Sequence, residues 1–141
     1  MFFLFEKGGN YMLFGEKIKE LRKKEGLTQE ALAAELDITK RTLINYETGR
    51  CYPKQSEIIM QIAKRFSVSA DYLMSEADEF VFEAQKAGGA RGMAQAKELI
   101  AEVGGLFAGG ELEECDKDAV LRAIIDAYWD AKRENTKYAR G

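Results

Sequence analysis

A cluster of hydrogen-bond donors, Lys40, Arg41 and Asn45, lies within six consecutive residues of this 141-residue chain. Lysine and arginine carry positive charge and several N–H donors, and the asparagine amide both donates and accepts. Leu43 and Tyr46 fall among them at helical spacing, so in a helix these two side chains share a face and the donors point elsewhere. A helix of this kind packs by one face and presents its donors to a partner outside the protein. The chemistry that the pattern predicts is recognition by hydrogen bonds.

The absence of histidine and the small number of cysteines exclude several classes of function. It has no histidine, so imidazole metal ligands and histidine-based acid–base catalysis are excluded. Its two cysteines, Cys51 and Cys115, lie far apart and match no metal-binding spacing. Sparse, unpaired cysteine suits a reducing compartment. We therefore expect a cytoplasmic protein that is not an enzyme and needs no metal or other cofactor.

Two short helices with a tight turn between them would position the donors. Thr39 can cap the start of their helix because its hydroxyl accepts a bond from an unpaired N–H of the first turn, and Gly49 can end it. Upstream, Thr28 can cap a helix that ends near Leu36. Asp37 stands where the turn needs a left-handed residue. Two helices joined by so short a turn make a helix-turn-helix, whose second helix enters the major groove of double-stranded DNA.

At this point the sequence resembles the phage-repressor and Cro-type (XRE) family of transcriptional regulators. The resemblance extends from about Phe14 to Met74, about half of the chain. The family usually has glycine where Asp37 stands, and aspartate tolerates that backbone conformation at a modest cost. The matching residues are Leu27-Thr28-Gln29, Leu32-Ala33, Leu36, Ile38-Thr39, Leu43, Tyr46-Glu47, Gly49, Pro53, Ile62-Ala63, Val68-Ser69 and Tyr72-Leu73.

The resemblance implies both a fold and a function. The expected fold is all-α, with a five-helix lambda-repressor-like DNA-binding domain over residues 12–75. The expected function is that of a sequence-specific DNA-binding transcriptional regulator, a repressor that binds a two-fold operator as a dimer. One helix-turn-helix reads too few base pairs to find a single site in a genome, whereas a dimer doubles the readout.

The resemblance also implies roles for individual residues. The donors expected to reach base edges are Lys40, Arg41 and Asn45, with Thr42 as a lesser contact. The side chains expected to meet backbone phosphates are Gln29, Thr39, Thr48, Arg50 and Lys54. Arg22 and Glu47 are expected to form a partly buried ion pair that ties the first helix to the third. Glu47 is therefore expected to be architectural and not to read bases.

The charge distribution has the sign that phosphate contact requires. Residues 15–75 carry 11 Lys/Arg and 9 Asp/Glu, whereas residues 76–141 carry 9 and 14. The mild surplus of positive charge thus lies on the half predicted to bind DNA.

The C-terminal region, residues 76–141, is predicted to be helical. Residues 80–84 fit either a short strand or a helix, and we favour a helix that Gly88-Gly89 ends. From Met93 to Phe107 apolar residues recur at three-four spacing, which predicts an amphipathic helix with a coiled-coil-like seam. We interpret Gly104-Gly105, like Gly88-Gly89, as a helix break, because neither pair has the context of a phosphate-binding loop.

The last predicted helix runs to about residue 134 and carries apolar side chains around most of its circumference. A helix of this kind is buried on two sides. The preceding helix can cover one side and a second copy of the chain the other. We therefore predict a homodimer whose interface includes Leu121, Ile125, Tyr128 and Trp129. The alternative is that this surface folds back onto the DNA-binding domain of the same chain. The region also leaves room for an unidentified protein or small-molecule effector.

The first eleven residues fit neither domain. The apolar stretch Phe2-Phe3-Leu4-Phe5 is too short for a signal-peptide core and lacks a basic flank. Lys7-Gly8-Gly9 can be encoded by a bacterial ribosome-binding sequence and lies just before Met12. We favour a translated leader with Met12 as the biological start, and the alternative is a disordered arm. No apolar run approaches the roughly 20 residues needed to span a bilayer, so no membrane partner is expected.

Two other classes of function are each suggested by part of the sequence. An autoproteolytic repressor with a Ser/Lys dyad is suggested only by Ala87-Gly88, and fewer than 60 residues follow, too few for that β-rich peptidase. An antitoxin or anti-regulator would act mainly through protein–protein interaction and keep the helix-turn-helix as a scaffold. The base-reading donors argue against it, because a scaffold does not need them.

Overall fold

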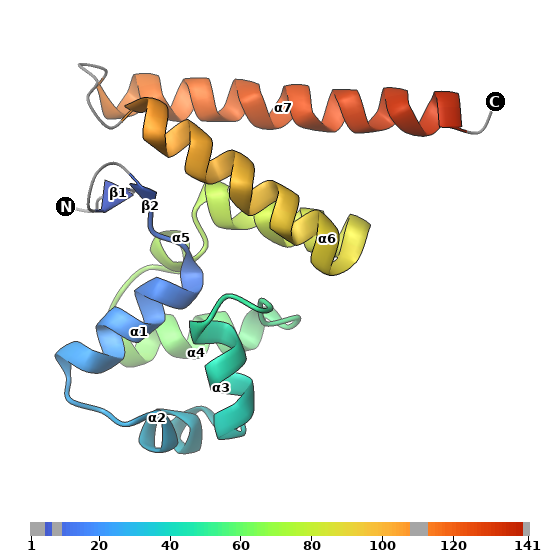
Figure 1. Ribbon diagram of the computed structural model, residues 1–141. Coiled ribbons are helices and arrows are strands. Elements are labelled where there is room, and N and C mark those ends of the chain that lie inside the picture. Colours follow the sequence, from blue (N-terminus) through green and yellow to red (C-terminus); the bar gives the residue numbers. More distant parts are fainter. Residues whose placement is uncertain (1–4, 7–9, 108–112, 140–141) are drawn as a thin grey trace.

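The computed structural model describes residues 5–6, 10–107 and 113–139. Within these residues the chain forms seven helices and one antiparallel pair of two-residue strands (Figure 1). The all-α fold class is thus confirmed. In chain order the elements are β1 (Phe5–Glu6), β2 (Asn10–Tyr11), α1 (Phe14–Lys24), α2 (Gln29–Leu36), α3 (Lys40–Glu47), α4 (Ser56–Phe66), α5 (Ala70–Leu73), α6 (Glu76–Phe107) and α7 (Glu114–Ala139).

Hydroxyl caps start three of the five N-terminal helices. Thr28, Thr39 and Ser69 each accept a hydrogen bond of 3.0 Å from the backbone N–H three residues further on. These bonds satisfy N–H groups that a helix start leaves unpaired. Asp37 closes the turn between α2 and α3 in the left-handed conformation, with a φ of 56°. The caps Thr28 and Thr39 and the turn residue Asp37 are those that the sequence predicts.

One apolar core runs through α1–α5 and continues into α6. Ile18, Leu43, Ile62 and Leu73 are fully buried in the N-terminal helices, and Val81 of α6 is equally buried. All five belong to a single cluster of buried side chains. The N-terminal helices and α6 therefore fold as one packed unit.

Helix α6 is divided by a kink at Gly88 and Gly89. Gly88 has a φ of −134° and Gly89 a φ of +63°, so the chain turns there (Figure 1). The two arms pack closely, because a Cβ at Gly92 would lie 2.5 Å from the carbonyl oxygen of Ala84. The predicted helix over residues 80–84 and its end at Gly88-Gly89 are confirmed. The predicted break at Gly104-Gly105 is wrong, since α6 runs through it to Phe107.

Most of the predicted N-terminal leader or arm, residues 1–11, lies outside the described residues. The described pairs Phe5–Glu6 and Asn10–Tyr11 form β1 and β2, with Phe5 opposite Tyr11. Tyr11 is 6% exposed and packs with the core cluster, and β2 contacts α6. Tyr11 therefore belongs to the folded unit, although we expected it outside. The start at Met12 stays a prediction.

Helix α7 packs against α6 on the side away from α2 and α3 (Figure 1). The ring of Phe80 on α6 meets those of Tyr128 and Trp129 edge-to-face, with centroids 5.0 and 5.9 Å apart. Leu121 is 1% exposed in the single chain, and Ile125 is half-buried. This corrects the predicted dimer interface at Leu121, which is fully covered within its own chain. Tyr128 and Trp129 contact α6 but are only half-buried, so their part in an interface stays a prediction. None of the described helices is long and apolar enough to cross a membrane.

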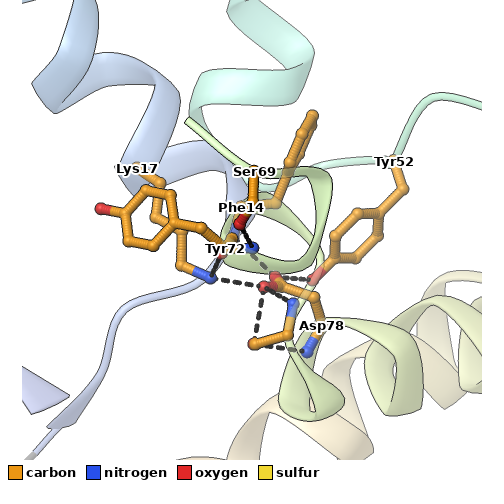
Figure 2. A network of polar contacts seen from close by, with 7 residues as sticks. Phe14, Lys17, Tyr52, Ser69, Tyr72 and Asp78 are labelled. Atoms are coloured by element: carbon orange, nitrogen blue, oxygen red, sulfur yellow. Dashed lines mark hydrogen bonds and ion pairs between the residues drawn. The ribbon is translucent and has the colours of Figure 1, made fainter. Parts of the chain in front are cut away.

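A buried ion pair joins the start of α1 to the start of α6 (Figure 2). Lys17 and Asp78 lie 2.9 Å apart, and their side chains are 1% and 0% exposed. Lys17 also donates to the carbonyl oxygen of Tyr72, at 2.6 Å. Asp78 accepts from the backbone N–H of Phe14 at 2.6 Å and from the hydroxyl of Tyr52 at 2.8 Å. Burial and the neighbouring carboxylate raise the pKa of Tyr52, so its hydroxyl stays protonated and donates.

The same carboxylate caps α6. Asp78 accepts from the backbone N–H and the hydroxyl of Ser75, at 3.2 and 2.9 Å. The Ser75 hydroxyl in turn accepts from the N–H of Asp78 at 3.4 Å, so the two residues form a reciprocal capping box. The network does not follow from residue type, because Lys17 and Asp78 have the residue types of a solvated surface. The spacing Ser75-x-x-Asp78 was the available signal.

Replacing Asp78 by alanine is expected to lower the free energy of unfolding by about 3–5 kcal/mol, because the Lys17 ammonium would stay buried without a counter-charge. Urea denaturation of the full chain, followed by circular dichroism at the helix band, measures the change. Asp71→Ala is the matched control, since Asp71 is an exposed acid on the neighbouring α5. Equal stability of the two variants would contradict the role given to Asp78.

Candidate nucleic-acid interface

Helix α3 has one buried face and one exposed face. Leu43 is fully buried and Tyr46 is 8% exposed, so both point into the core as their spacing predicts. Lys40 and Arg41 are exposed, and Asn45 is half-buried. Together with α2, the helix lies at the end of the molecule opposite α7 (Figure 1). The donors predicted to reach bases are thus gathered on an accessible helix at one end of the fold.

Two of the four predicted base readers have a partner within the protein. The Lys40 ammonium lies 3.0 Å from a carboxylate oxygen of Glu30 on α2, and both side chains are largely exposed. This hydrogen bond and the charge of Lys40 lower the pKa of Glu30. Thr42, which is half-buried, accepts a 2.8 Å hydrogen bond from the hydroxyl of Thr39. Arg41 and Asn45 have no side-chain hydrogen bond or ion pair among the described residues.

The residues predicted to meet phosphates lie at both ends of α3 and at the start of α2. Thr39 and Thr48 are exposed, and the Thr48 hydroxyl donates to the carbonyl oxygen of Ile44 at 2.8 Å. Arg50 and Lys54 are exposed on the loop that follows α3. Each of these four side chains can reach a ligand without any change in the packing of the core.

Gln29 departs from this pattern, because its amide is already engaged. Its Nε2 donates to Glu47 Oε1 over 3.1 Å, and the residue is half-buried. An amide nitrogen carries two N–H donors, so one is left for a phosphate. Gln29 is therefore both a support for α3 and the predicted phosphate contact.

Arg22 and Glu47 form the ion pair that the resemblance implies. Arg22 Nε and Nη2 donate to the two carboxylate oxygens at 2.7 and 3.0 Å. The side chains are 10% and 2% exposed, and Arg22 Nη1 also donates to the carbonyl oxygen of Leu27 at 2.9 Å. This two-pronged geometry fixes orientation as well as distance, because the guanidinium and the carboxylate are both planar. Glu47 thus ties α3 to α1, with both of its carboxylate oxygens engaged within the protein.

Gly15, whose role the sequence alone did not indicate, brings α1 and α3 together. A Cβ at Gly15 would lie 2.2 Å from the carbonyl oxygen of Tyr46 and 3.0 Å from that of Glu47. The end of α3 therefore touches the backbone of α1 directly. Only glycine permits so close an approach. A glycine near the start of an amphipathic helix was the available signal.

The chain matches a known family over this region. Residues 15–79, which run from the second residue of α1 to the beginning of α6, match the family described as "Helix-turn-helix domain". Residues 15–79 form a helix-turn-helix domain. The match confirms the resemblance to XRE-type regulators, and the domain is of the kind that transcriptional regulators carry. No solved structure matches the chain significantly.

Three relatives extend the comparison. The HTH-type transcriptional activator BcrR of Enterococcus faecalis is 41% identical over 64 residues, 45% of this chain and 31% of that protein. The HTH-type transcriptional regulator ImmR of Bacillus subtilis is 34% identical over 65 residues, 46% of this chain and 50% of that protein. This chain thus spans about a third of BcrR and half of ImmR.

The third relative is similar along most of its length. The uncharacterized HTH-type transcriptional regulator YqaE of Bacillus subtilis is 29% identical over 126 residues, 89% of this chain and 97% of that protein. The similarity to YqaE therefore includes the C-terminal region as well as the helix-turn-helix domain. The other two matches are about the size of that domain alone.

Gly15→Ala is expected to destabilise the protein by roughly 1–3 kcal/mol, because the added methyl group would force α3 away from α1. Gly105→Ala provides the control. A Cβ at Gly105 meets nothing within 4 Å, and alanine in a helix is favoured over glycine by about 0.5–1 kcal/mol. Thermal unfolding of both variants measures the difference. A Gly15→Ala protein as stable as Gly105→Ala would show that the α1–α3 contact is not tight.

Proposed function

We propose that this protein is a sequence-specific transcription regulator that binds a two-fold operator as a dimer and represses the adjoining gene. The observation that carries the proposal is the accessible outer face of α3, held on a rigid base. Arg41 and Lys40 project from that face, while Arg22 and Glu47 fix its position from within. A surface organised in this way suits recognition of a stiff partner, since little order must be gained on binding.

The roles of the outer residues follow from their chemistry. Arg41 and Lys40 suit the acceptors of guanine, and the Asn45 amide suits adenine. Lys40 must break its ion pair with Glu30 before it can contact a base or a phosphate. Its contribution to the free energy of DNA binding is therefore smaller than its charge suggests. Arg50 and Lys54 flank the end of α3 and suit backbone phosphates, which set the register on the duplex.

A DNA-bound protein represses a gene simply by occupying a site that RNA polymerase needs. A small DNA-binding domain with a helical extension supports this simple mechanism. The relative named as an activator, BcrR, matches only over a domain-sized segment, so its direction of control does not carry over by itself. A reporter fused to the selected operator decides the direction: deletion of the gene should raise expression from it.

The proposed dimer forms through the side of α7 that α6 does not cover. Val120 is 38% exposed, and Ala123, Ala127 and Ala131 are exposed in the single chain. They lie at three- and four-residue intervals, which places them along one stripe of the helix. Small side chains let two helices approach closely, and Val120 adds apolar area. We therefore place the proposed two-fold contact on this stripe and not on Leu121 and its neighbours.

The alternative function is that of an antitoxin or anti-regulator that acts through protein contacts. An accessible face of α3 would then have no use for free donors such as Arg41. We also infer that the protein is not an enzyme and acts in the cytoplasm, where the DNA lies. What supports this inference is that the site is built from hydrogen-bond donors rather than from paired acids and bases.

Arg41→Ala and Lys54→Ala are expected to weaken DNA binding in different ways. Arg41→Ala should cost about 1–3 kcal/mol on the preferred sequence and relax preference at one position, because a base contact is lost. Lys54→Ala should weaken binding to all sequences about equally, because a phosphate contact is lost. Selection of bound duplexes from a random pool with each full-length variant, followed by fluorescence anisotropy, measures both effects.

Lys86→Ala is the control for charge alone, since Lys86 is an exposed lysine on α6 that pairs with Glu83. It should leave affinity unchanged. If the unaltered protein enriched no sequence from the pool, the proposed function would be wrong. Unchanged affinity and preference in Arg41→Ala would show instead that α3 does not read bases.

Ala127→Glu is expected to convert a dimer to a monomer, because two buried carboxylates would face each other across the two-fold contact. The single chain should fold normally, since Ala127 is exposed in it. Analytical ultracentrifugation at micromolar concentration measures the state, with Ala101→Glu, an exposed alanine on α6, as the control. A monomeric unaltered protein would refute the dimer. A dimeric Ala127→Glu protein would show that the interface lies outside this stripe.

A further inference from the structure

A cavity of about 220 Å3 lies between the helix-turn-helix domain and the second arm of α6. Aromatic and apolar side chains form most of its wall, and the end of α3 forms one side. Its lining residues are Leu13, Phe14, Gly15, Glu16, Tyr46, Glu47, Thr48, Gly49, Cys51, Tyr52, Met93 and Lys97. An apolar cavity of about 150 Å3 is enough to hold a benzene molecule, so this one can hold a small ring with a substituent.

Lys97 brings the only positive charge to the described lining. Its ammonium donates to the carbonyl oxygen of Gly49 at the end of α3. In the described part of the chain no carboxylate lies within 4.0 Å of it, and the residue is half-buried. Burial lowers the pKa of Lys97, and the nearby charge of Glu16 opposes this shift. The ammonium is thus partly stripped of water without a direct counter-charge.

The two acidic residues in the lining, Glu16 and Glu47, repel a bound anion only weakly. Both carboxylate oxygens of Glu47 accept from Arg22, so its charge is compensated. Glu16 is exposed on α1, where water screens its charge. The charge that remains uncompensated at the cavity is that of Lys97.

We propose that this cavity binds a small monocarboxylic acid with a flat apolar body, about the size of benzoate, whose carboxylate pairs with Lys97. The ring of the ligand lies against Phe14, Tyr46 and Met93, which are largely buried and form an apolar wall. A carboxylate is a stronger acceptor for an ammonium than the carbonyl oxygen of Gly49. The ligand carboxylate therefore competes with the Gly49 carbonyl oxygen for the Lys97 ammonium.

The position of the cavity links its occupancy to the DNA-binding face. Thr48 and Gly49 line it, and Arg50, a proposed phosphate contact, follows directly. Loss of the Lys97 bond to Gly49 frees this turn, so ligand binding lowers operator affinity, and operator DNA lowers ligand affinity by the same factor. This link rests on the proposed function, whereas ligand binding itself does not.

The full-length protein with 13C-labelled methionine methyl groups tests the proposal without DNA. Benzoate is expected to shift the methyl signal of Met93, which lines the cavity, along a saturating curve. Met60, which is 63% exposed on α4, is the internal control and should not move. Benzamide, which has the same shape without the charge, should bind about tenfold more weakly.

Two substitutions on α6 complete the test. Lys97→Met should weaken benzoate about tenfold and leave benzamide unchanged, because only the charged contact is removed. Lys86→Met removes an exposed lysine from the same helix and should change neither. Equal shifts of Met93 and Met60, equal affinity for benzoate and benzamide, or undiminished benzoate binding by Lys97→Met would each overturn the proposal.

Discussion

Two planar charged groups, the Arg22 guanidinium and the Glu47 carboxylate, fix where α3 can lie. Both groups are almost fully buried. Two guanidinium nitrogens of Arg22 donate to the two carboxylate oxygens of Glu47. Gln29 from α2 binds the same carboxylate, so one acid holds three helices in register. Such a pair contributes little net stability, because desolvation offsets the attraction, but removal of either partner is strongly destabilising. Its effect is to make one arrangement of α1, α2 and α3 the stable one.

A second buried carboxylate extends this arrangement to the C-terminal region. Asp78 caps α6, neutralises Lys17 of α1 and accepts from Tyr52 of the loop after α3. The helix-turn-helix domain and α6 are therefore joined by charge as well as by the shared core. The cavity beside Lys97 lies at the same junction. A change in α6 can thus reach the end of α3 through direct contacts.

The elements that the sequence predicted well are those with local causes. The caps Thr28 and Thr39 and the left-handed Asp37 act on their own helix ends, so residue type and spacing suffice. The features that it missed depend on residues far apart in the chain. Lys17 and Asp78 meet across 61 positions, and the close approach at Gly15 depends on the placement of α3. Leu121 was assigned to a dimer because an apolar stripe does not say which helix covers it.

The most direct test of the account is a nitrogen-resolved NMR titration of the full-length protein with the duplex that it selects. The account predicts that backbone amide signals change at the start of α2, along α3 and in the loop around Arg50 and Lys54. Amides of residues 130–134, which are exposed on α7, should change little. Large changes along α7 with none on α3 would contradict it, because the partner would then be bound by the C-terminal region and not by the helix that Arg22 and Glu47 hold in place.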